Sequence, residues 1–190
     1  MLRKSITLFC LSLFTILPAQ AATDWKPAGY AELQQAYTNQ ATINAFYEAF
    51  AHHDAAAMAK LYHPQIEFHD PVFGTLKGKE ASAMWAMLLA AGDDLKVVHS
   101  QVSATPSTGS AHWDAWYPFS LTGNRVHNQI DAQFEFKDGL IYRHTDHFDL
   151  HRWSSMALGP IGDLLGGTAL VQGTVQKLAR KRLDDYMGSH

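Results

Sequence analysis

The sequence predicts an α+β fold in which helices pack on one face of a curved antiparallel sheet. Three observations predict it. Apolar residues recur at helical spacing in the first half of the chain, and from residue 96 they alternate with polar residues, as expected for strands. Within the alternating part lies Asp138-Gly139, a dipeptide typical of a two-residue hairpin turn, because that turn needs positive φ at both central residues. Helices therefore come first, and a meander of four strands follows.

The clearest helical signal is the spacing of Ile43, Phe46, Tyr47 and Phe50, because positions i, i+3, i+4 and i+7 lie on one face of a helix. The His63-Pro64 pair is expected to end a later helix, since the residue before proline disfavours helical backbone. The expected elements, in order, are a short helix at 30–37, a helix at 42–53 capped by Thr42, a helix at 55–62 capped by Asp54, a strand at 65–69, a loop at 70–78 and a helix at 79–91.

The second half is expected to form strands at 96–105 and 111–121 and then a long hairpin at 128–151. A two-residue turn places Lys137 opposite Leu140. Strict alternation then predicts three polar pairs on one face, namely Glu135 with Tyr142, Gln133 with His144, and Asp131 with Asp146. The opposite face is expected to be the core and carries Ile130, Ala132, Phe134 and Phe136. The polar face is therefore predicted to form the floor of a functional pocket.

The two ends of the chain fall outside this pattern. Residues 1–21 begin with a basic pair, continue with an apolar run and end in Ala19-Gln20-Ala21. This predicts a secretory signal peptide cleaved after Ala21, and hence a periplasmic or secreted protein. Residues 22–41 form a leader with the short helix, and residues 153–190 form a glycine-rich segment followed by an amphipathic helix. Three roles are open for this tail: a cover over the pocket mouth, a dimer contact, or a helix on a membrane surface.

Charge and cysteine content exclude several classes of function. Without Arg3 and Lys4, 13 basic residues remain against 18 acidic ones, a net charge of −5 with neutral histidines. Nucleic acid is therefore not expected as a partner, and membrane contact is not favoured once the signal peptide is cleaved. Cys10 is the only cysteine and lies in the predicted signal peptide. The mature chain would thus have no disulfide, and a packed core must supply its stability.

Five short motifs follow one another through the chain: FYEAFAHHDAAAMAKLY, HDPVFG, GKEA, QIDAQFEFKDGLI and HTDHFD. In this order and spacing, residues 42–159 resemble the SnoaL-like and ketosteroid-isomerase-like group of the nuclear transport factor 2-like superfamily. The resemblance implies a cone-shaped fold, in which a strongly curved antiparallel sheet wraps around three N-terminal helices and encloses one pocket. The domain would occupy residues 42–152, with an extra C-terminal helical tail. The resemblance also implies a small hydrophobic ligand and a homodimer.

Candidate catalytic residues follow from the resemblance position by position. Asp70 of HDPVFG matches the general base of ketosteroid isomerases, and Asp131 matches the acid that donates to the substrate oxygen. His144 and Asp146 match the His and Asp on the last strand of SnoaL-type cyclases. The resemblance thus implies a cofactor-independent acid/base isomerase, cyclase or hydrolase that acts on an apolar carbonyl compound or a related ligand.

The expected ligand contacts depart from the isomerase pattern at one position. A Tyr on the first helix of the isomerases is replaced here by Phe46, with Tyr47 one residue further on. On a helix, one residue turns the side chain by about 100°. The residues expected to contact the ligand are Tyr47, Phe46, Trp116, Phe148, Gln133 and Trp85.

Two other functions stay open. The same fold can serve as a non-catalytic ligand-binding or dimerisation module, which the replacement at Phe46 favours. A metal site is the second alternative, because His144 and Asp146 share one strand face; a third ligand such as His112 or His127 would then be needed. The other aromatic residues of the strand at 111–121 are expected to pack in the core, and they include Trp113, Tyr117 and Phe119.

Overall fold

The computed structural model of the chain describes residues 28–92 and 94–190. The predicted signal peptide and its cleavage site lie outside the described residues. None of the helices in the described ranges combines the length and the hydropathy needed to cross a bilayer.

The N-terminal half forms three helices, α1 (Tyr30–Ala51), α2 (Ala55–Leu61) and α3 (Lys79–Leu89), and the two helices expected at 30–37 and 42–53 are the single helix α1. The expected helix start at Thr42 is wrong, because α1 runs without a break and the Thr42 hydroxyl donates to the Thr38 carbonyl one turn earlier, at 3.0 Å. The predicted cap of α2 is confirmed, since Asp54 Oδ1 accepts the Ala57 amide at 2.8 Å. The cap satisfies one of the unpaired N–H groups at the helix start.

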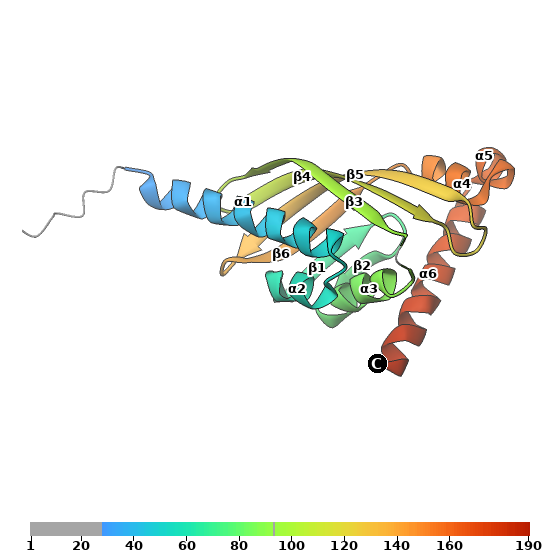
Figure 1. The fold of residues 1–190 in the computed structure, drawn as a ribbon, viewed down its shortest axis with the longest axis horizontal. Coiled ribbons are helices and arrows are strands. Elements are labelled where there is room, and N and C mark those ends of the chain that lie inside the picture. Colours follow the sequence, from blue (N-terminus) through green and yellow to red (C-terminus); the bar gives the residue numbers. More distant parts are fainter. Residues whose placement is uncertain (1–27, 93) are drawn as a thin grey trace, which may run out of the picture.

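A curved, open sheet of six strands packs against these helices, which confirms the α+β fold (Figure 1). Its strands lie in the order β2-β1-β6-β5-β4-β3, and β1 runs parallel to β6 while the other neighbours are antiparallel. Four strands were expected in the meander, and β2 was missed because it lies in the segment assigned to a loop. The strands are β1 (Tyr62–Asp70), β2 (Gly74–Lys77), β3 (Lys96–Ala104), β4 (Thr108–Pro118), β5 (Arg125–Lys137) and β6 (Leu140–His147).

The β5–β6 hairpin has the predicted turn but not the predicted register. Asp138 and Gly139 both have positive φ, 53° and 77°, and Lys137 lies opposite Leu140. A bulge then shifts the pairing by one residue, so that Glu135 lies opposite Arg143 rather than Tyr142. The extra residue, Tyr142, packs its ring against His63 of β1 at 5.5 Å between ring centroids.

The bulge reverses the face of every β6 residue that follows it, because side chains alternate along a strand. The expected pairs of Gln133 with His144 and of Asp131 with Asp146 are therefore wrong. His144 lies opposite Phe134, and Asp146 lies opposite Ala132. Both polar residues point inward, with exposed fractions of 0% and 3%.

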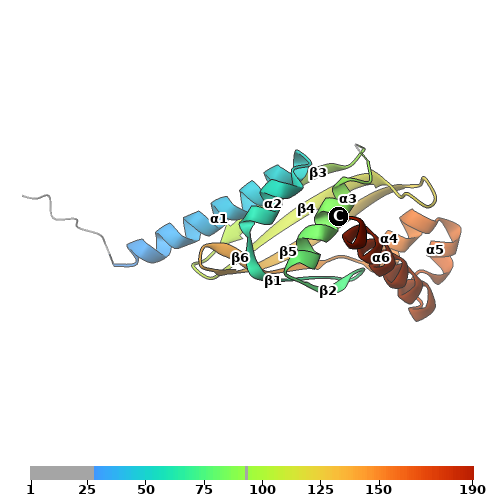
Figure 2. The ribbon, with the colours of Figure 1, turned by 90° about the horizontal axis from the view of Figure 1, so that it is seen from below.

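The core lies between the inner face of the sheet and the helices. Figure 2 shows the helices that lie on this face of the sheet. It is rich in aromatic rings, which stack edge to face on one another, for example Phe46 on Trp85 at 5.8 Å between centroids. Burial of such rings supplies most of the stability of a chain without disulfides. The largest fully buried apolar side chains include Tyr47, Phe46, Phe68, Ile43, Met58, Ile66, Met84 and Ile141.

The tail forms three further helices, α4 (Leu150–Leu158), α5 (Pro160–Leu165) and α6 (Ala169–Ser189), gathered at one end of the sheet (Figure 1). The expected continuation of the last strand to His151 is wrong, since β6 ends at His147 and Asp149 caps α4 by accepting the His151 amide at 2.9 Å. Helix α6 packs against α3, and its Arg180 pairs with Glu80 of α3 at 2.6 Å. Leu183 of α6 is fully buried. The C-terminal tail therefore packs directly against the domain.

The crossing of α4 and α5 depends on Gly162, because a Cβ there would overlap the Ser154 carbonyl group. We expect Gly162→Ala to lower the free energy of unfolding by about 1–3 kcal/mol, although alanine is the better helix former. Urea denaturation measures this value. Gly173→Ala in α6 is the matched control, since nothing lies within 4 Å of its Cβ position, and it should be neutral or stabilising. Equal effects of the two changes would contradict the tight α4–α5 contact.

Candidate functional site

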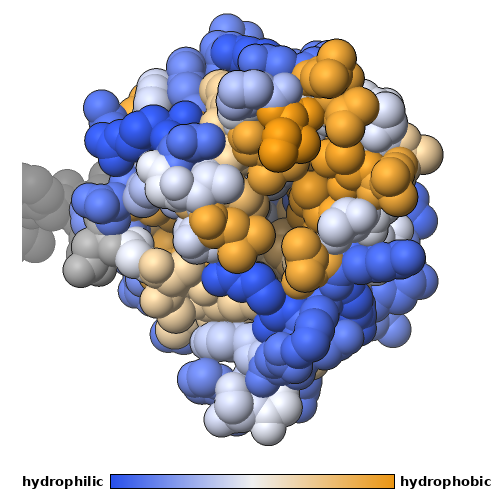
Figure 3. Space-filling view, turned by 90° about the vertical axis from the view of Figure 1, so that its right-hand side faces the viewer, coloured by the Kyte–Doolittle hydropathy of each residue, from blue (hydrophilic) through white to orange (hydrophobic). Residues whose placement is uncertain are grey.

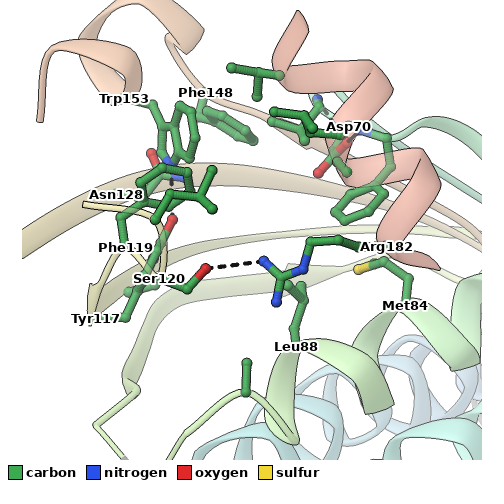
Figure 4. Close-up of a pocket in the computed structure, with 18 of the residues that line it drawn as sticks. Asp70, Met84, Leu88, Tyr117, Phe119, Ser120, Asn128, Phe148, Trp153 and Arg182 are labelled. Carbon is green, nitrogen blue, oxygen red and sulfur yellow. Dashed lines mark hydrogen bonds between the residues drawn. The ribbon is translucent and has the colours of Figure 1, made fainter. Parts of the chain in front are cut away.

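A cavity of about 710 Å³ lies between the inner face of the sheet, α3 and the C-terminal helices. Its walls are mainly apolar, and the few polar side chains that reach it come from different elements (Figure 4). The pocket is thus an unfilled end of the core and lies on the inner face of the sheet. The prediction that it lies on the opposite, polar face of the hairpin is wrong. The buried polar residues of its lining are Asp70, Asn128 and Asp146.

Asp70 ends β1 and is 9% exposed. Its Oδ1 accepts the backbone N–H groups of Val72 (2.9 Å) and Phe73, so the carboxyl group both holds the following turn and lines the cavity. Burial raises the pKa of Asp70 to about 7; the Phe73 amide opposes the rise, and the charge of Asp146 adds to it. Protonated and ionised forms of Asp70 are therefore both accessible near neutral pH.

Asp146 is positioned by a buried chain of hydrogen bonds. Its Oδ1 lies 3.0 Å from His144 Nε2 and 3.2 Å from the Trp113 indole nitrogen. His144 Nδ1 lies 2.7 Å from the Tyr62 hydroxyl, and the Trp85 indole donates to that hydroxyl at 2.9 Å.

The groups at the two ends of this series of hydrogen bonds decide which group donates and which accepts. An indole nitrogen only donates, so the Tyr62 oxygen accepts from Trp85 and its own proton is free to go to His144 Nδ1. With Nδ1 as the acceptor, the His144 tautomer that carries its hydrogen on Nε2 donates it to Asp146. Both donors to Asp146 reach the same oxygen, Oδ1, and within the described residues Oδ2 accepts no hydrogen bond. Asp146 is thus held rigidly while one of its oxygens stays available.

Tyr117 supplies a polar group that the sequence analysis assigned to the core. It lines the cavity, and the Trp153 indole of α4 donates to its hydroxyl oxygen at 2.8 Å. Burial raises the pKa of Tyr117 to about 12, and the Asp70 charge contributes to the rise. The hydroxyl therefore stays protonated, and with its oxygen engaged by Trp153 its own hydrogen can be donated to a ligand. Figure 4 shows Tyr117, Asn128 and Trp153 on one side of the cavity and Asp70 on the other.

Two of the predicted site residues, Asp131 and Gln133, lie on the outer face of the sheet. The Asp131 side chain is 80% exposed, and its carboxylate accepts from His112 Nδ1 at 2.7 Å. Its predicted place in the pocket is wrong, since on β5 it alternates with inward-facing Ile130 and Ala132. Trp116 is also outside the lining and stacks on His127 at 4.6 Å between centroids.

Of the other predicted ligand contacts, Trp85 and Phe148 line the cavity. Phe46 and Tyr47 are fully buried in the core and are not part of the lining. The Tyr47 hydroxyl has no hydrogen-bond partner among the described residues. The expected contact of Phe46 and Tyr47 with the ligand is therefore not found in this arrangement.

The metal hypothesis finds no support in the part of the chain that the structure describes. Within residues 28–92 and 94–190, no group of three or more His, Cys, Asp or Glu side chains is placed to hold an ion. His112 and His127 lie on the outer face, where both pair with Asp114, at 3.5 and 2.6 Å. They are thus separated from His144 and Asp146 by the sheet itself.

Comparisons with known proteins agree with this fold. The family model of the SnoaL-like domain matches residues 43–144. Bal32a from a soil-derived mobile gene cassette has a TM-score of 0.57 at 24% identity, with 64% of this chain and 98% of Bal32a covered. A candidate polyketide cyclase from Xanthomonas campestris pv. campestris has a TM-score of 0.55 at 19% identity, with 64% and 98% covered.

An LEH-like epoxide hydrolase of M. tuberculosis has a TM-score of 0.53 at 14% identity, with 70% of this chain and 99% of that chain covered. A comparison with curated proteins finds no match. At these identities the likeness to solved structures shows the fold, and the activity must be argued from the site. The family match ends at residue 144, so α4, α5 and α6 lie beyond it.

Proposed function

The chain belongs to the SnoaL-like domain family, and from this premise we propose that it is a cofactor-independent acid/base enzyme for a small apolar carbonyl compound. The reaction is an isomerisation or cyclisation that begins with removal of a proton next to the carbonyl group. The predicted signal peptide supports action in the periplasm or outside the cell, as a homodimer in keeping with the family resemblance.

The observation that carries this proposal is the presence of two buried carboxyl groups, Asp70 and Asp146, in one mainly apolar cavity. Perturbed carboxyl groups in a cleft are candidates for acid/base chemistry, because burial brings their pKa towards the working pH. Asp70 has this property, with a pKa of about 7.

In the proposed mechanism, ionised Asp70 takes a proton from the carbon next to the carbonyl group. The electron pair of that C–H bond forms a C=C bond to the carbonyl carbon, and the π pair of the carbonyl group moves onto its oxygen. The Tyr117 hydroxyl donates a hydrogen bond to the developing oxyanion, the role that the resemblance assigned to Asp131. Asp70 then returns the proton to the substrate at a second position. Asp146, held by its hydrogen bonds, fixes the local electrostatic field. No step needs a metal or a redox cofactor.

A carrier of apolar ligands is the second candidate, favoured by the mainly apolar lining of the cavity. The two candidates differ in one measurable property, which is whether a bound ketone exchanges its acidic protons with solvent. A carrier binds the ketone without accelerating this exchange.

The test is proton–deuterium exchange in D2O, followed by NMR, on a panel of apolar cyclic and aryl ketones. We expect the protein to accelerate exchange for at least one of them near pH 7. Asp70→Asn should reduce the rate about 10²–10⁴-fold, the usual contribution of a general base, and Tyr117→Phe should also reduce it. Asp131→Asn is the matched control, because it makes the same change on the outer face and should leave the rate unchanged. No acceleration by the wild-type protein for any ketone, or full activity of Asp70→Asn, would overturn the proposal.

A further inference from the structure

The C-terminal helices supply one wall and the mouth of the cavity, and these residues lie beyond the family match. Trp153 and Leu158 come from α4, and Ile161 comes from α5. Helix α6 contributes Leu170, Val171, Thr174, Val175, Leu178, Ala179 and Arg182. The ligand contacts that this wall provides are therefore additional to those of the family domain. Figure 3 shows the same end of the molecule, with hydrophobic residues gathered over it.

The rim of the mouth is apolar. Leu121 in the β4–β5 turn, Ile161 and Leu170 all line the cavity and are 67%, 64% and 80% exposed. Exposed leucine and isoleucine side chains around an apolar cavity favour entry of an apolar molecule, because binding removes apolar surface of both the molecule and the rim from water.

One cation lies in this apolar mouth. Arg182 of α6 is the only lysine or arginine in the lining that the described residues provide. Its Nη1 reaches across the mouth and donates to Ser120 Oγ at 3.1 Å, which Figure 4 shows as a dashed line. A guanidinium group carries five N–H donors, so this single bond to a neutral hydroxyl leaves most of them for a ligand.

The neighbouring cations of α6 behave differently. Arg180 pairs with Glu80 at 2.6 Å and with Asp184 at 2.9 Å, and Lys181 pairs with Asp185 at 2.6 Å. Arg182 forms no ion pair with a described carboxylate. Asp94 also lines the cavity and forms no ion pair with Arg182. The positive charge is therefore directed at the mouth without a partner in residues 28–92 and 94–190.

We propose that the natural ligand is an amphiphile, with an apolar body in the cavity and a carboxylate that Arg182 binds at the mouth. Planar bidentate contacts make arginine well suited to carboxylates. The inference rests on the proposed function for the reacting end of the ligand, which lies at Asp70 and Tyr117. The carboxylate at the other end fixes how far the ligand enters and thus which carbon meets Asp70.

The test measures binding without turnover, with decanoate, decanol and decyltrimethylammonium as probes below their solubility or micelle limits. Quenching of the intrinsic fluorescence reports binding, because Trp85, Trp113 and Trp153 line the cavity. We expect decanoate to bind about tenfold more tightly than decanol, a difference of about 1.4 kcal/mol. Decyltrimethylammonium should bind more weakly than either.

Variants assign this preference to Arg182. Arg182→Gln should weaken decanoate binding about tenfold while decanol binding stays unchanged, and Arg182→Lys should keep part of the preference. Lys177→Gln is the matched control, because Lys177 is an exposed cation on the same helix and is not part of the lining. Equal binding of decanoate and decanol, or an equal loss of both in Arg182→Gln, would overturn the inference. Loss of ketone exchange with the decanoate preference intact would instead reject the catalytic proposal alone.

Discussion

Asp70→Asn is expected to stabilise the folded protein at pH 8 by up to about 4 kcal/mol and to have no effect at pH 3. The reason is the pKa of the carboxyl group, which burial raises from 3.8 to about 7 on folding. Between these values the folded chain keeps the proton and the unfolded chain loses it. The free energy of unfolding therefore falls by about 1.4 kcal/mol for each pH unit, until the folded form ionises as well. Asparagine cannot ionise, so the variant avoids this loss.

The backbone contacts of Asp70 make the substitution a fair test. Asparagine keeps an Oδ1 that can accept the amides of Val72 and Phe73. Urea denaturation of the wild-type protein and the variant at pH 3, 5, 7 and 8 gives the difference in unfolding free energy, in which other titrating groups cancel. The difference should grow from pH 4 to pH 7. Asp131→Asn, on the exposed face, should show no such growth. A pH-independent difference for Asp70→Asn would contradict a raised pKa.

His144→Ala is expected to cost about 3–5 kcal/mol of stability, the second large effect. His144 is fully buried and packs on the Phe134 ring at 4.5 Å between centroids. Its removal leaves a cavity among aromatic rings. It also deprives buried Asp146 of one donor and leaves the Tyr62 hydroxyl without its acceptor. Each buried polar group that loses its partner adds its own desolvation cost.

The matched control for this change lies three residues along the same strand. His147 is exposed, so His147→Ala should change the unfolding free energy by less than about 0.5 kcal/mol. Tyr62→Phe tests the buried chain of hydrogen bonds itself, because it removes only the hydroxyl that bonds to His144 Nδ1. We expect the free energy of unfolding to fall by about 1–3 kcal/mol. Urea denaturation at pH 7 measures all three. Equal effects of His144→Ala and His147→Ala would show that the strand faces are reversed.

Part of the candidate site was predictable, because it lies in local motifs. Asp70 was identified from HDPVFG, and it does line the cavity. His144 and Asp146 were expected on one face because they are two residues apart on a strand, and they do share a face. Asn128 could have been added by extending the alternation of Ile130 and Ala132 backwards, since it lies on the same inner face.

The other site residues depend on contacts between distant parts of the chain. The Tyr117 hydroxyl, the proposed donor to the ligand, has its oxygen engaged by Trp153, which lies 36 residues later in the chain. Arg182 reaches the mouth only because α6 folds back onto α3, where Leu183 is fully buried. No local pattern in the sequence places either residue at the cavity.

The sequence by itself determined the α+β class, the helices α2 and α3, the apolar face of α1, the Asp54 cap and the turn at Asp138-Gly139, because each depends on backbone preferences and apolar spacing over a few residues. Only the tertiary structure decided which acidic residues enter the cavity. The bulge at Tyr142 carries Asp146 inward, and Asp131 stays on the outer face of β5. The ring of Tyr142 packs on His63 of β1, a strand far away in the chain. Alternation along a single strand cannot predict a bulge associated with packing on another.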